Sequence, residues 1–351
     1  MTTISGGRAV LTQVEGGVAS VTLNRPQVIN ALSAEMVRII TDALLAWMRD
    51  PRVACVVLRG RGRGFCAGGD LQAGDVDADD FLRTEYALDA LIAEYPKPVI
   101  ALMHGLVLGG GVGLSAHAAV RVVTDSTRLG MPETRIGLCP DVGGSRLLGR
   151  APGAVGVMKA MASATMPASE AIAFGFADVF VADADLDALL VALGAGVREG
   201  RDPWTVIRDS GLVREPDPVS SPPWVEDVFG GGDAVEIVRR LEAGAPDAQE
   251  LAARIREMSP FAVAVTVPLV RRAATLTLRE TLQLEYAVMT ALSARADTAE
   301  GIRARLVDRD VPRWRPARLE DVVPAEVDAL LDTSRRPLDF HTITPLKETA
   351  R

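Results

Sequence analysis

Two short runs in this chain are apolar at every position, at 53–58 and 98–103, and a third, RVVT at 121–124, is apolar at its centre; these runs constrain the fold more than any other feature. A strand that is apolar throughout, instead of at every second residue, is typical of a sheet covered on both faces. We therefore predict buried, parallel strands over residues 53–58, 98–103 and 121–124. A stretch with helical spacing over 34–48, which Ser33 is placed to cap, precedes the first of them. Strands that alternate with helices indicate an α/β core.

Local patterns predict further elements. Residues 18–23 are rich in β-branched side chains and follow two glycines, so we expect a hairpin strand there. Residues 114–120 are expected to be helical, and so are 233–258 and 276–296, where apolar residues recur at helical spacing. The last two stretches contain few strand signals, so the end of the chain is expected to be mainly helical.

A proline-rich stretch divides the chain. Residues 214–224 hold four prolines and two serines, a composition that resists both helix and strand. We therefore expect an α/β catalytic core over 1–213, a loop or linker over 214–224, and a mainly helical C-terminal region over 225–351.

The charge and the cysteines exclude several classes of protein. With 38 Lys+Arg against 46 Asp+Glu, the net charge of −8 argues against a nucleic-acid-binding protein. The three cysteines, Cys55, Cys66 and Cys139, form no CxxC pair, so we expect neither a disulfide framework nor a metal site. No apolar run is long enough to cross a membrane, and the first residues lack the layout of a signal peptide. We expect a cytoplasmic protein that does not associate with membranes.

Two glycine-rich turns follow predicted strands, at 64–71 and at 104–113. Glycine allows the backbone to approach a ligand closely, and the second turn leads into a helix whose first N–H groups have no internal partner. A dinucleotide phosphate is one candidate ligand, but neither a clean G-x-G-x-x-G nor a P-loop lysine is present. Two amides from separate turns could instead form an oxyanion hole. Ordinary tight turns are the alternative.

Two carboxylates lie on irregular backbone further along. Glu133 follows Pro132 and Asp141 follows Pro140, so a continuous helix between them is not expected. Such a pair can share general acid/base or nucleophilic work. The alternatives are that Asp141 caps a helix starting near Ser145 and that Glu133 is a surface charge.

Taken together, these segments resemble the crotonase (enoyl-CoA hydratase/isomerase) superfamily. The matching text is Asn24-Arg25-Pro26 with Asn30-Ala31-Leu32, FCAGGDL at 65–71, PKPVIALMHGLVLGGGVGLS at 96–115 and MPETRIGLCPDVGG at 131–144. The resemblance covers most of residues 10–185 and implies an α/β fold with a crotonase-like ββα superhelix as its core. It also implies an oxyanion hole made by the backbone N–H groups of Gly69 and Gly110, which would bind the thioester carbonyl of an acyl-coenzyme A.

One departure points to a particular branch. Hydratases of this superfamily use two glutamates, and the place of one of them is taken here by Gly113. The 3-hydroxyisobutyryl-CoA hydrolase branch is similar to this chain at that glycine, at Glu85-Tyr86 and in its longer C-terminus, including LRETLQLEY at 278–286. This resemblance implies Glu133 and Asp141 as catalytic residues. It implies a substrate-binding set that comprises Ala67, Gly68, Glu85, Gly110, Glu133 and Asp141.

The resemblance implies hydrolysis of 3-hydroxyisobutyryl-CoA, as in valine breakdown. Glu133 would attack the carbonyl carbon directly or through a water, Asp141 would bind the 3-hydroxyl or handle protons, and Glu85 would line the acyl pocket. Coenzyme A is part of the substrate, so no cofactor is expected, and its phosphate would meet one of four arginines, Arg25, Arg59, Arg61 or Arg63. A homotrimer or hexamer is possible. The alternatives are an enoyl-CoA hydratase or isomerase of the same fold, and a non-catalytic acyl-CoA-binding protein.

Overall fold

Two sheets and a large set of helices make up the protein. The computed structural model describes residues 9–71, 77–332, 337–338 and 340. The strands are β1 (Val10–Glu15), β2 (Val18–Leu23), β3 (Cys55–Gly60), β4 (Gly64–Cys66), β5 (Val99–Met103), β6 (Leu106–Leu108), β7 (Val120–Val123), β8 (Arg128–Gly130), β9 (Thr165–Met166), β10 (Val179–Val181) and β11 (Val213–Arg214). The α-helices are α1 (Ala34–Met48), α2 (Ala78–Ala93), α3 (Gly110–Ala116), α4 (Gly144–Arg150), α5 (Val155–Met161), α6 (Ala168–Ala173), α7 (Leu186–Arg198), α8 (Pro203–Asp209), α9 (Trp224–Phe229), α10 (Ala234–Glu242), α11 (Pro246–Arg256), α12 (Pro260–Ala273), α13 (Leu278–Ser293), α14 (Ala296–Ile302) and α15 (Pro324–Leu330). Short 3-10 helices are η1 (Pro26–Val28), η2 (Glu133–Ile136), η3 (Asp183–Asp185) and η5 (Leu319–Asp321), and η4 (Arg303–Val307) is a π-helix.

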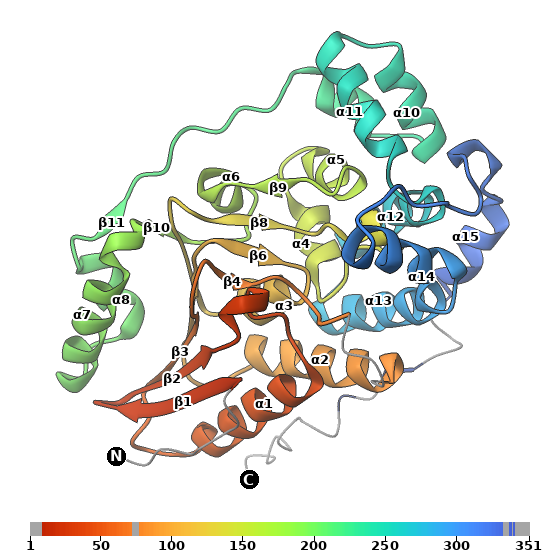
Figure 1. The fold of residues 1–351 in the computed structure, drawn as a ribbon. Helices are drawn as coiled ribbons and strands as arrows, with labels where there is room; N and C mark the ends of the chain where they lie inside the picture. Colours follow the sequence, from red (N-terminus) through yellow and green to blue (C-terminus); the bar gives the residue numbers. More distant parts are fainter. Residues whose placement is uncertain (1–8, 72–76, 333–336, 339, 341–351) are drawn as a thin grey trace.

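The larger sheet has the order β1-β2-β3-β5-β7-β10-β11. Its central strands β2, β3, β5, β7 and β10 pair in parallel, and three of them, β3, β5 and β7, confirm the parallel strands predicted over 53–58, 98–103 and 121–124. Both faces of this sheet are covered, because Val57 and Ile100 pack with α7 and α8 while Val56 and Ala101 pack in the main core with α1 and α2. Figure 1 shows α7 and α8 on one side of the sheet and α1 and α2 on the other. The predicted α/β core is confirmed.

The smaller sheet has the order β4-β6-β8-β9. Its strands alternate along the chain with those of the larger sheet, so that β3 is followed by β4 and α2, and β5 by β6 and α3. This repeat is the expected ββα superhelix. It places the turn after β4 next to the turn after β6, because β4 and β6 are neighbours in the smaller sheet.

The predicted helix over 114–120 is wrong in its position. The helix α3 already begins at Gly110 within the glycine run and ends at Ala116, and β7 starts at Val120. Close packing explains why glycines form this helix, since a Cβ on Gly111 would lie 2.6 Å from the carbonyl oxygen of Cys66.

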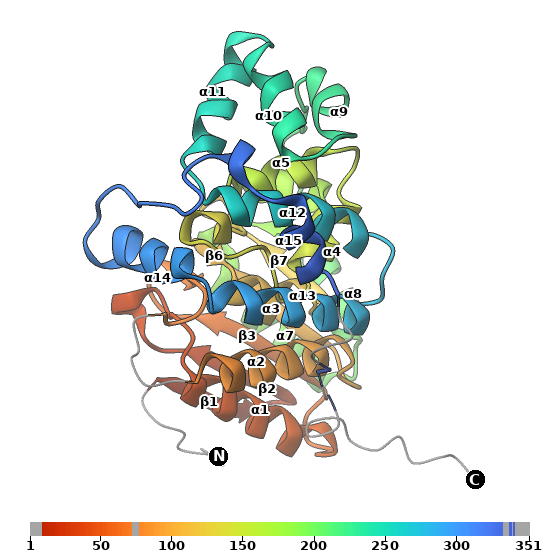
Figure 2. The same ribbon diagram turned by 90° about the vertical axis from the view of Figure 1, so that its right-hand side faces the viewer.

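The C-terminal helices fold over the core of the same chain. Residues 215–222 run in an extended path from β11 to α9, while Arg214 and Trp224, at the ends of the predicted linker, belong to β11 and α9. The helix expected over 233–258 is two helices, α10 and α11, separated at residues 243–245. Further along, α12 contacts α4 and α5, and α13 contacts α2 and α4, which Figure 2 shows from the side. None of the helices in the described part of the chain is long and apolar enough to cross a membrane.

Candidate active site

The two glycine turns bring two unpaired main-chain amides together. Leu32 holds the first turn, because its N–H donates to the Gly68 carbonyl at 2.8 Å and its carbonyl accepts from Asp70 N–H at 2.9 Å. This pairing leaves the N–H of Gly69 without an acceptor among the described residues, and the N–H of Gly110, at the first position of α3, has none either. The two glycines are adjacent, since a Cβ on Gly110 would lie 3.6 Å from the nitrogen of Gly69. Both amides are therefore available to one ligand atom.

Glu133 faces these turns. It begins the 3-10 helix η2, and its residue is only 7% exposed, so the alternative of a surface charge is wrong. A Cβ on Gly109 would lie 2.9 Å from its Oε1, and its Oε2 has no hydrogen-bond partner among the described residues. Burial, and secondarily the charge of Asp141, raises the pKa of the Glu133 carboxyl.

Asp141 is bound by a tyrosine from α2. The hydroxyl of Tyr86 donates to Oδ2 of Asp141 at 2.8 Å, and both side chains are buried. The alternative that Asp141 caps the following helix is wrong, because the residue at the N-cap of α4 is Gly143. Burial raises the pKa of the Asp141 carboxyl to about 7, although the hydrogen bond from Tyr86 acts in the opposite direction.

Glu85 precedes Tyr86 on α2 and lies against the second glycine turn. A Cβ on Gly110 would collide with Oε1 of Glu85, and none of the residues that the structure describes forms a hydrogen bond with this oxygen. Burial raises the pKa of the Glu85 carboxyl, and the charge of Asp141 adds to the effect. The structure thus places Glu85 and Glu133 against the second glycine turn, and it places Asp141 near enough to both for its charge to raise their pKa values.

The predicted Ala67 and Gly68 lie in the first of these turns. Ala67 N–H donates to the Ile29 carbonyl at 2.9 Å, and Gly68 adopts a φ of +97°, in the left-handed region. A Cβ on Gly68 would lie 3.7 Å from the nitrogen of Gly110, so both residues border the pair of amides.

Two further buried carboxyls, Asp89 and Glu285, escaped sequence reasoning. Asp89 lies one turn beyond Glu85 on α2 and is 0% exposed, and within the described part of the chain neither of its carboxyl oxygens has a hydrogen-bond partner. A Cβ on Gly113 would lie 2.7 Å and 2.8 Å from those oxygens, so a side chain at position 113 has no room. The spacing of four residues from Glu85 was the available signal, since it puts both carboxyls on one helix face.

Glu285 comes from α13, in the C-terminal region. It accepts from Gly143 N–H at 2.7 Å, Ser145 N–H at 3.2 Å and the Ser145 hydroxyl at 2.5 Å. Burial raises the pKa of its carboxyl to about 8, although these hydrogen bonds act in the opposite direction. Nothing in the sequence links it to residues more than 130 positions earlier.

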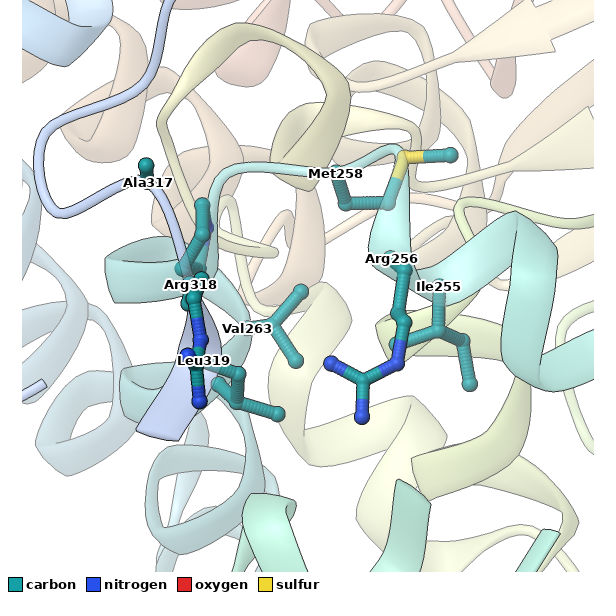
Figure 3. A pocket seen from close by; sticks show the side chains of 8 residues that line it. Ile255, Arg256, Met258, Val263, Ala317, Arg318 and Leu319 are labelled. Atoms are coloured by element: carbon teal, nitrogen blue, oxygen red, sulfur yellow. The ribbon is translucent and has the colours of Figure 1, made fainter. Parts of the chain in front are cut away.

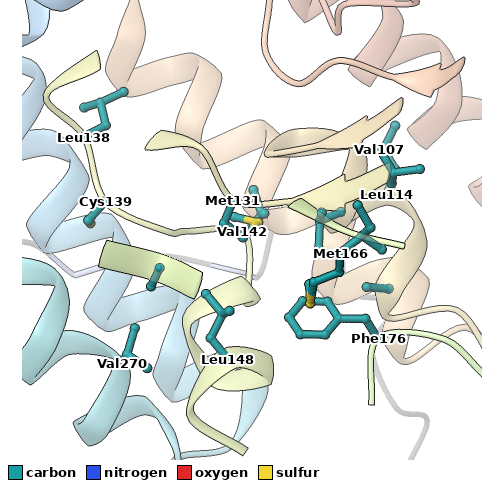
Figure 4. Close-up of a cluster of buried hydrophobic side chains, with 14 of the residues drawn as sticks. Val107, Leu114, Met131, Leu138, Cys139, Val142, Leu148, Met166, Phe176 and Val270 are labelled. Atoms are coloured by element: carbon teal, nitrogen blue, oxygen red, sulfur yellow. The ribbon is translucent and has the colours of Figure 1, made fainter. Parts of the chain in front are cut away.

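The site is electrostatically unusual because its carboxyls have no cation beside them. None of the five is within ion-pair distance of an Arg, Lys or His in the described part of the chain. Neighbouring apolar side chains exclude water, and Figure 4 shows Met131, Cys139 and Val142 in this packing. Buried carboxyls this close cannot all be ionised, so at least some hold protons at neutral pH.

Three further polar residues, His117, Cys66 and His104, make contacts that support the fold. Half-buried His117 binds the Val142 carbonyl through Nε2 at 2.7 Å, and desolvation lowers its pKa to about 4. Buried Cys66 has a thiol pKa raised to about 12, which does not suit a nucleophile. His104 Nε2 lies 3.0 Å from the Gly62 carbonyl.

The four arginines considered for the coenzyme A phosphate differ in their ion pairs and in their exposure to solvent. Arg25 is held by Asp70 at 2.7 Å, and Arg59 lies 3.8 Å from Asp187. Arg61 and Arg63 are exposed, and Arg61 donates to Asn24 at 3.2 Å.

A separate pocket of about 170 Å³ lies between the α11–α12 segment and the start of η5. Figure 3 shows Arg256 and Arg318 reaching it from these two segments. Arg256 already binds Glu242 and Glu320, and none of the five buried carboxyls lines the pocket. Among the described residues no group of three His, Cys, Asp or Glu side chains could hold a metal ion.

Comparison with known proteins gives concordant matches over nearly the whole chain. The sequence model of a family described as enoyl-CoA hydratase/isomerase matches residues 18–331. The mitochondrial 3-hydroxyisobutyryl-CoA hydrolases of Gallus gallus and Rattus norvegicus are each 36% identical to this chain, over 94% and 91% of it and 89% and 88% of their own lengths.

Solved structures match as well. A protein from Mycobacterium thermoresistibile described as a carnitinyl-CoA dehydratase has a TM-score of 0.87 and 41% identity, over 95% of this chain and 99% of its own. One from Rhodobacter sphaeroides described as an enoyl-CoA hydratase has a TM-score of 0.80 and 39% identity, over 92% and 97%.

Proposed function

Because this chain belongs to the enoyl-CoA hydratase/isomerase family, with the crotonase fold, we propose that it is a thioesterase that hydrolyses 3-hydroxyisobutyryl-CoA to 3-hydroxyisobutyrate and coenzyme A. One observation carries the proposal: Glu133, whose Oε2 has no partner among the described residues, lies against Gly109, next to the neighbouring amides of Gly69 and Gly110, which have no acceptor there either. This arrangement offers both parts of an acyl-transfer site, a group that attacks and donors that receive the oxygen.

The amides of Gly69 and Gly110 form the oxyanion hole in this proposal. Attack on a thioester carbonyl places negative charge on its oxygen, and two fixed N–H donors stabilise that charge without reorganising. The surroundings are dry, because Glu85, Glu133 and Asp141 are all at most 7% exposed. Exclusion of water strengthens the interaction of the donors with the developing charge.

Glu133 delivers the nucleophile. In direct attack, its carboxylate oxygen bonds to the thioester carbon, the carbon–sulfur bond breaks, and the thiolate of coenzyme A leaves and takes up a proton. Water then opens the mixed anhydride, which restores the carboxylate and releases the hydroxy acid. In the alternative route, Glu133 takes a proton from a water that attacks the same carbon. A single turnover in ¹⁸O-labelled water that leaves ¹⁸O in Glu133 would show direct attack, because water that attacks the acyl carbon, in either route, labels only the hydroxy acid.

Asp141 and Glu85 handle the rest of the acyl group. With its pKa near 7, Asp141 is suited to exchange a proton with the leaving thiolate or with the 3-hydroxyl of the substrate. Glu85, whose Oε1 is unpaired beside Gly110, binds the same hydroxyl in this proposal. A β-hydroxyl satisfies a buried acceptor that a plain acyl chain would leave unpaired, which favours hydroxyacyl substrates.

An enoyl-CoA hydratase or isomerase is the second candidate, since two solved relatives are described as a dehydratase and a hydratase. Against it stands Gly113, where Asp89 and Val142 leave no space for a side chain. A non-catalytic acyl-CoA-binding protein would have no use for several buried, unpaired carboxyls, which are costly to keep.

Thiol release from 3-hydroxyisobutyryl-, 3-hydroxypropionyl- and crotonyl-CoA tests the proposal. A hydrolase releases thiol from the first, whereas a hydratase removes the enoyl absorbance of crotonyl-CoA and releases none. Binding of all three without turnover would identify a binding protein. We also propose that no cofactor takes part, so activity should survive dialysis against a chelator.

The proposal extends to the location of the protein in the cell and to its oligomeric state. We propose a cytoplasmic location, which the three buried free cysteines support as a reducing compartment. The two hydrolase relatives are described as mitochondrial, so cell fractionation decides. For a homotrimer or hexamer, light scattering should give three or six times 37.2 kDa; α12 and α13 already cover the chain's own core, so such an assembly would use other surfaces.

A further inference from the structure

We propose that Glu285, on the C-terminal helix α13, is a positioning residue that fixes the loop carrying Asp141. This inference rests on the proposed function, because it assigns Glu285 to the same reaction. Among the described residues, Glu285 forms no hydrogen bond with Glu133 or with the amides of Gly69 and Gly110. Its three hydrogen bonds go to Gly143 and Ser145.

The loop after Asp141 depends on an acceptor from elsewhere. Val142 and Gly143 have φ values of +51° and +78°, and the first is in a region that valine rarely adopts. The helix α4 starts directly after them. Gly143 at its N-cap has no side chain that could accept hydrogen bonds from the N–H groups of the first helical turn, which have no partner within the helix. Glu285 supplies both missing acceptor oxygens, Oε2 to Gly143 and Oε1 to Ser145.

Asp141 is therefore held from two helices. Its side chain is bound by Tyr86 of α2, and its carbonyl accepts from Gly144 N–H at 2.6 Å within the turn that Glu285 anchors. The two helices α2 and α13 contact each other, and α13 also contacts α4. A shift of this turn would move Asp141 relative to Tyr86, and small misplacements in a reacting array reduce turnover strongly.

A matched control lies on the same helix. Glu280 of α13 is exposed and caps its own helix, because its carboxylate accepts from Thr277 N–H at 2.8 Å and from the Thr277 hydroxyl at 2.7 Å. Glu280→Ala should weaken α13 without touching the loop. Glu285→Ala removes both acceptors, and Glu285→Gln keeps one oxygen but turns an amide donor toward an N–H.

The test measures thiol release from 3-hydroxyisobutyryl-CoA and amide exchange of residues 141–147 in the full chain. Glu285→Ala should lower kcat by at least about tenfold with a much smaller change in KM, within the ~10²-fold that misplacement can cost. Glu285→Gln should fall between this variant and the wild type, and Glu280→Ala should keep the kcat of the wild type. Exchange at Gly143 and Ser145 should accelerate in both Glu285 variants, most in Glu285→Ala, and should stay unchanged in Glu280→Ala.

Two results would contradict the inference about Glu285. Equal kcat in Glu285→Ala and Glu280→Ala would overturn it, as would unchanged exchange at Gly143 and Ser145. If Glu285→Ala does not fold, the kcat and exchange of Glu285→Gln carry the same comparison. A wild type that releases no thiol would refute the proposed function instead, and the exchange measurement would still decide whether Glu285 fixes the loop.

Discussion

The hydroxyl of Tyr86 donates a 2.8 Å hydrogen bond to Asp141, and both side chains are buried. This bond favours the ionised carboxylate, so it lowers a pKa that burial raises. The balance brings the pKa of Asp141 to about 7, where the group can both accept and release a proton. The pH dependence of turnover should therefore respond to the loss of the Tyr86 hydroxyl.

Tyr86→Phe should move the pH profile of turnover upward. Without the donor, the pKa of Asp141 rises, so the limb of the profile that titrates near pH 7 should shift by about one unit to higher pH, since a charge-assisted bond is worth roughly 1.5–3 kcal/mol and one unit is 1.36 kcal/mol. Tyr95→Phe is the matched control, because its hydroxyl binds the Leu44 carbonyl, away from the site. If the pH profile of Tyr86→Phe does not shift, Asp141 is not the group whose titration gives the limb near pH 7.

Gly110→Ala should reduce turnover by about 10²-fold, in the range that the loss of one oxyanion donor costs. The added Cβ would collide with Oε1 of Glu85, so the carboxyl or the amide must move. Gly231→Ala is a suitable control, because a Cβ there meets nothing within 4 Å. Steady-state kinetics of both variants give the comparison, and wild-type rates in Gly110→Ala would argue against the proposed hole.

Asp89→Asn should stabilise the protein at alkaline pH. Burial raises the pKa of Asp89 well above that of the unfolded chain, so the folded state binds the extra proton, and stability falls as the pH rises through the ordinary carboxyl range toward the folded pKa. An asparagine does not ionise and removes this loss. Urea unfolding should show a gain of about 1–3 kcal/mol at pH 8 and little change at pH 4. Equal effects at both pH values would contradict the linkage.

The sequence was sufficient for elements whose signals are local. Ser33 caps α1 with the predicted bounds, since its side chain accepts from Met36 N–H, and the strand over 18–23 is β2. The boundary of α3 was missed because glycine has low helix propensity, and only the close packing on β4 makes Gly111 a helical residue.

The candidate site divides in the same way. The two glycine turns follow β4 and β6, and Glu133 begins the 3-10 helix after β8, so short motifs after neighbouring strands are enough to locate them, whereas Asp141 lies further along, before α4. Asp89 and Glu285 carry no such motif: each owes its place to a helix packed across the core. A sequence shows that a glutamate lies on α13, but not that Gly143 lies opposite it.

The replacement of Glu133 by glutamine tests the central claim most directly. The amide keeps the size of the side chain but neither attacks a thioester nor takes a proton from water. Glu133→Gln should bind 3-hydroxyisobutyryl-CoA with an affinity similar to that of the wild type and should release thiol at least about 10³-fold more slowly. Thiol release at the rate of the wild type would contradict the account.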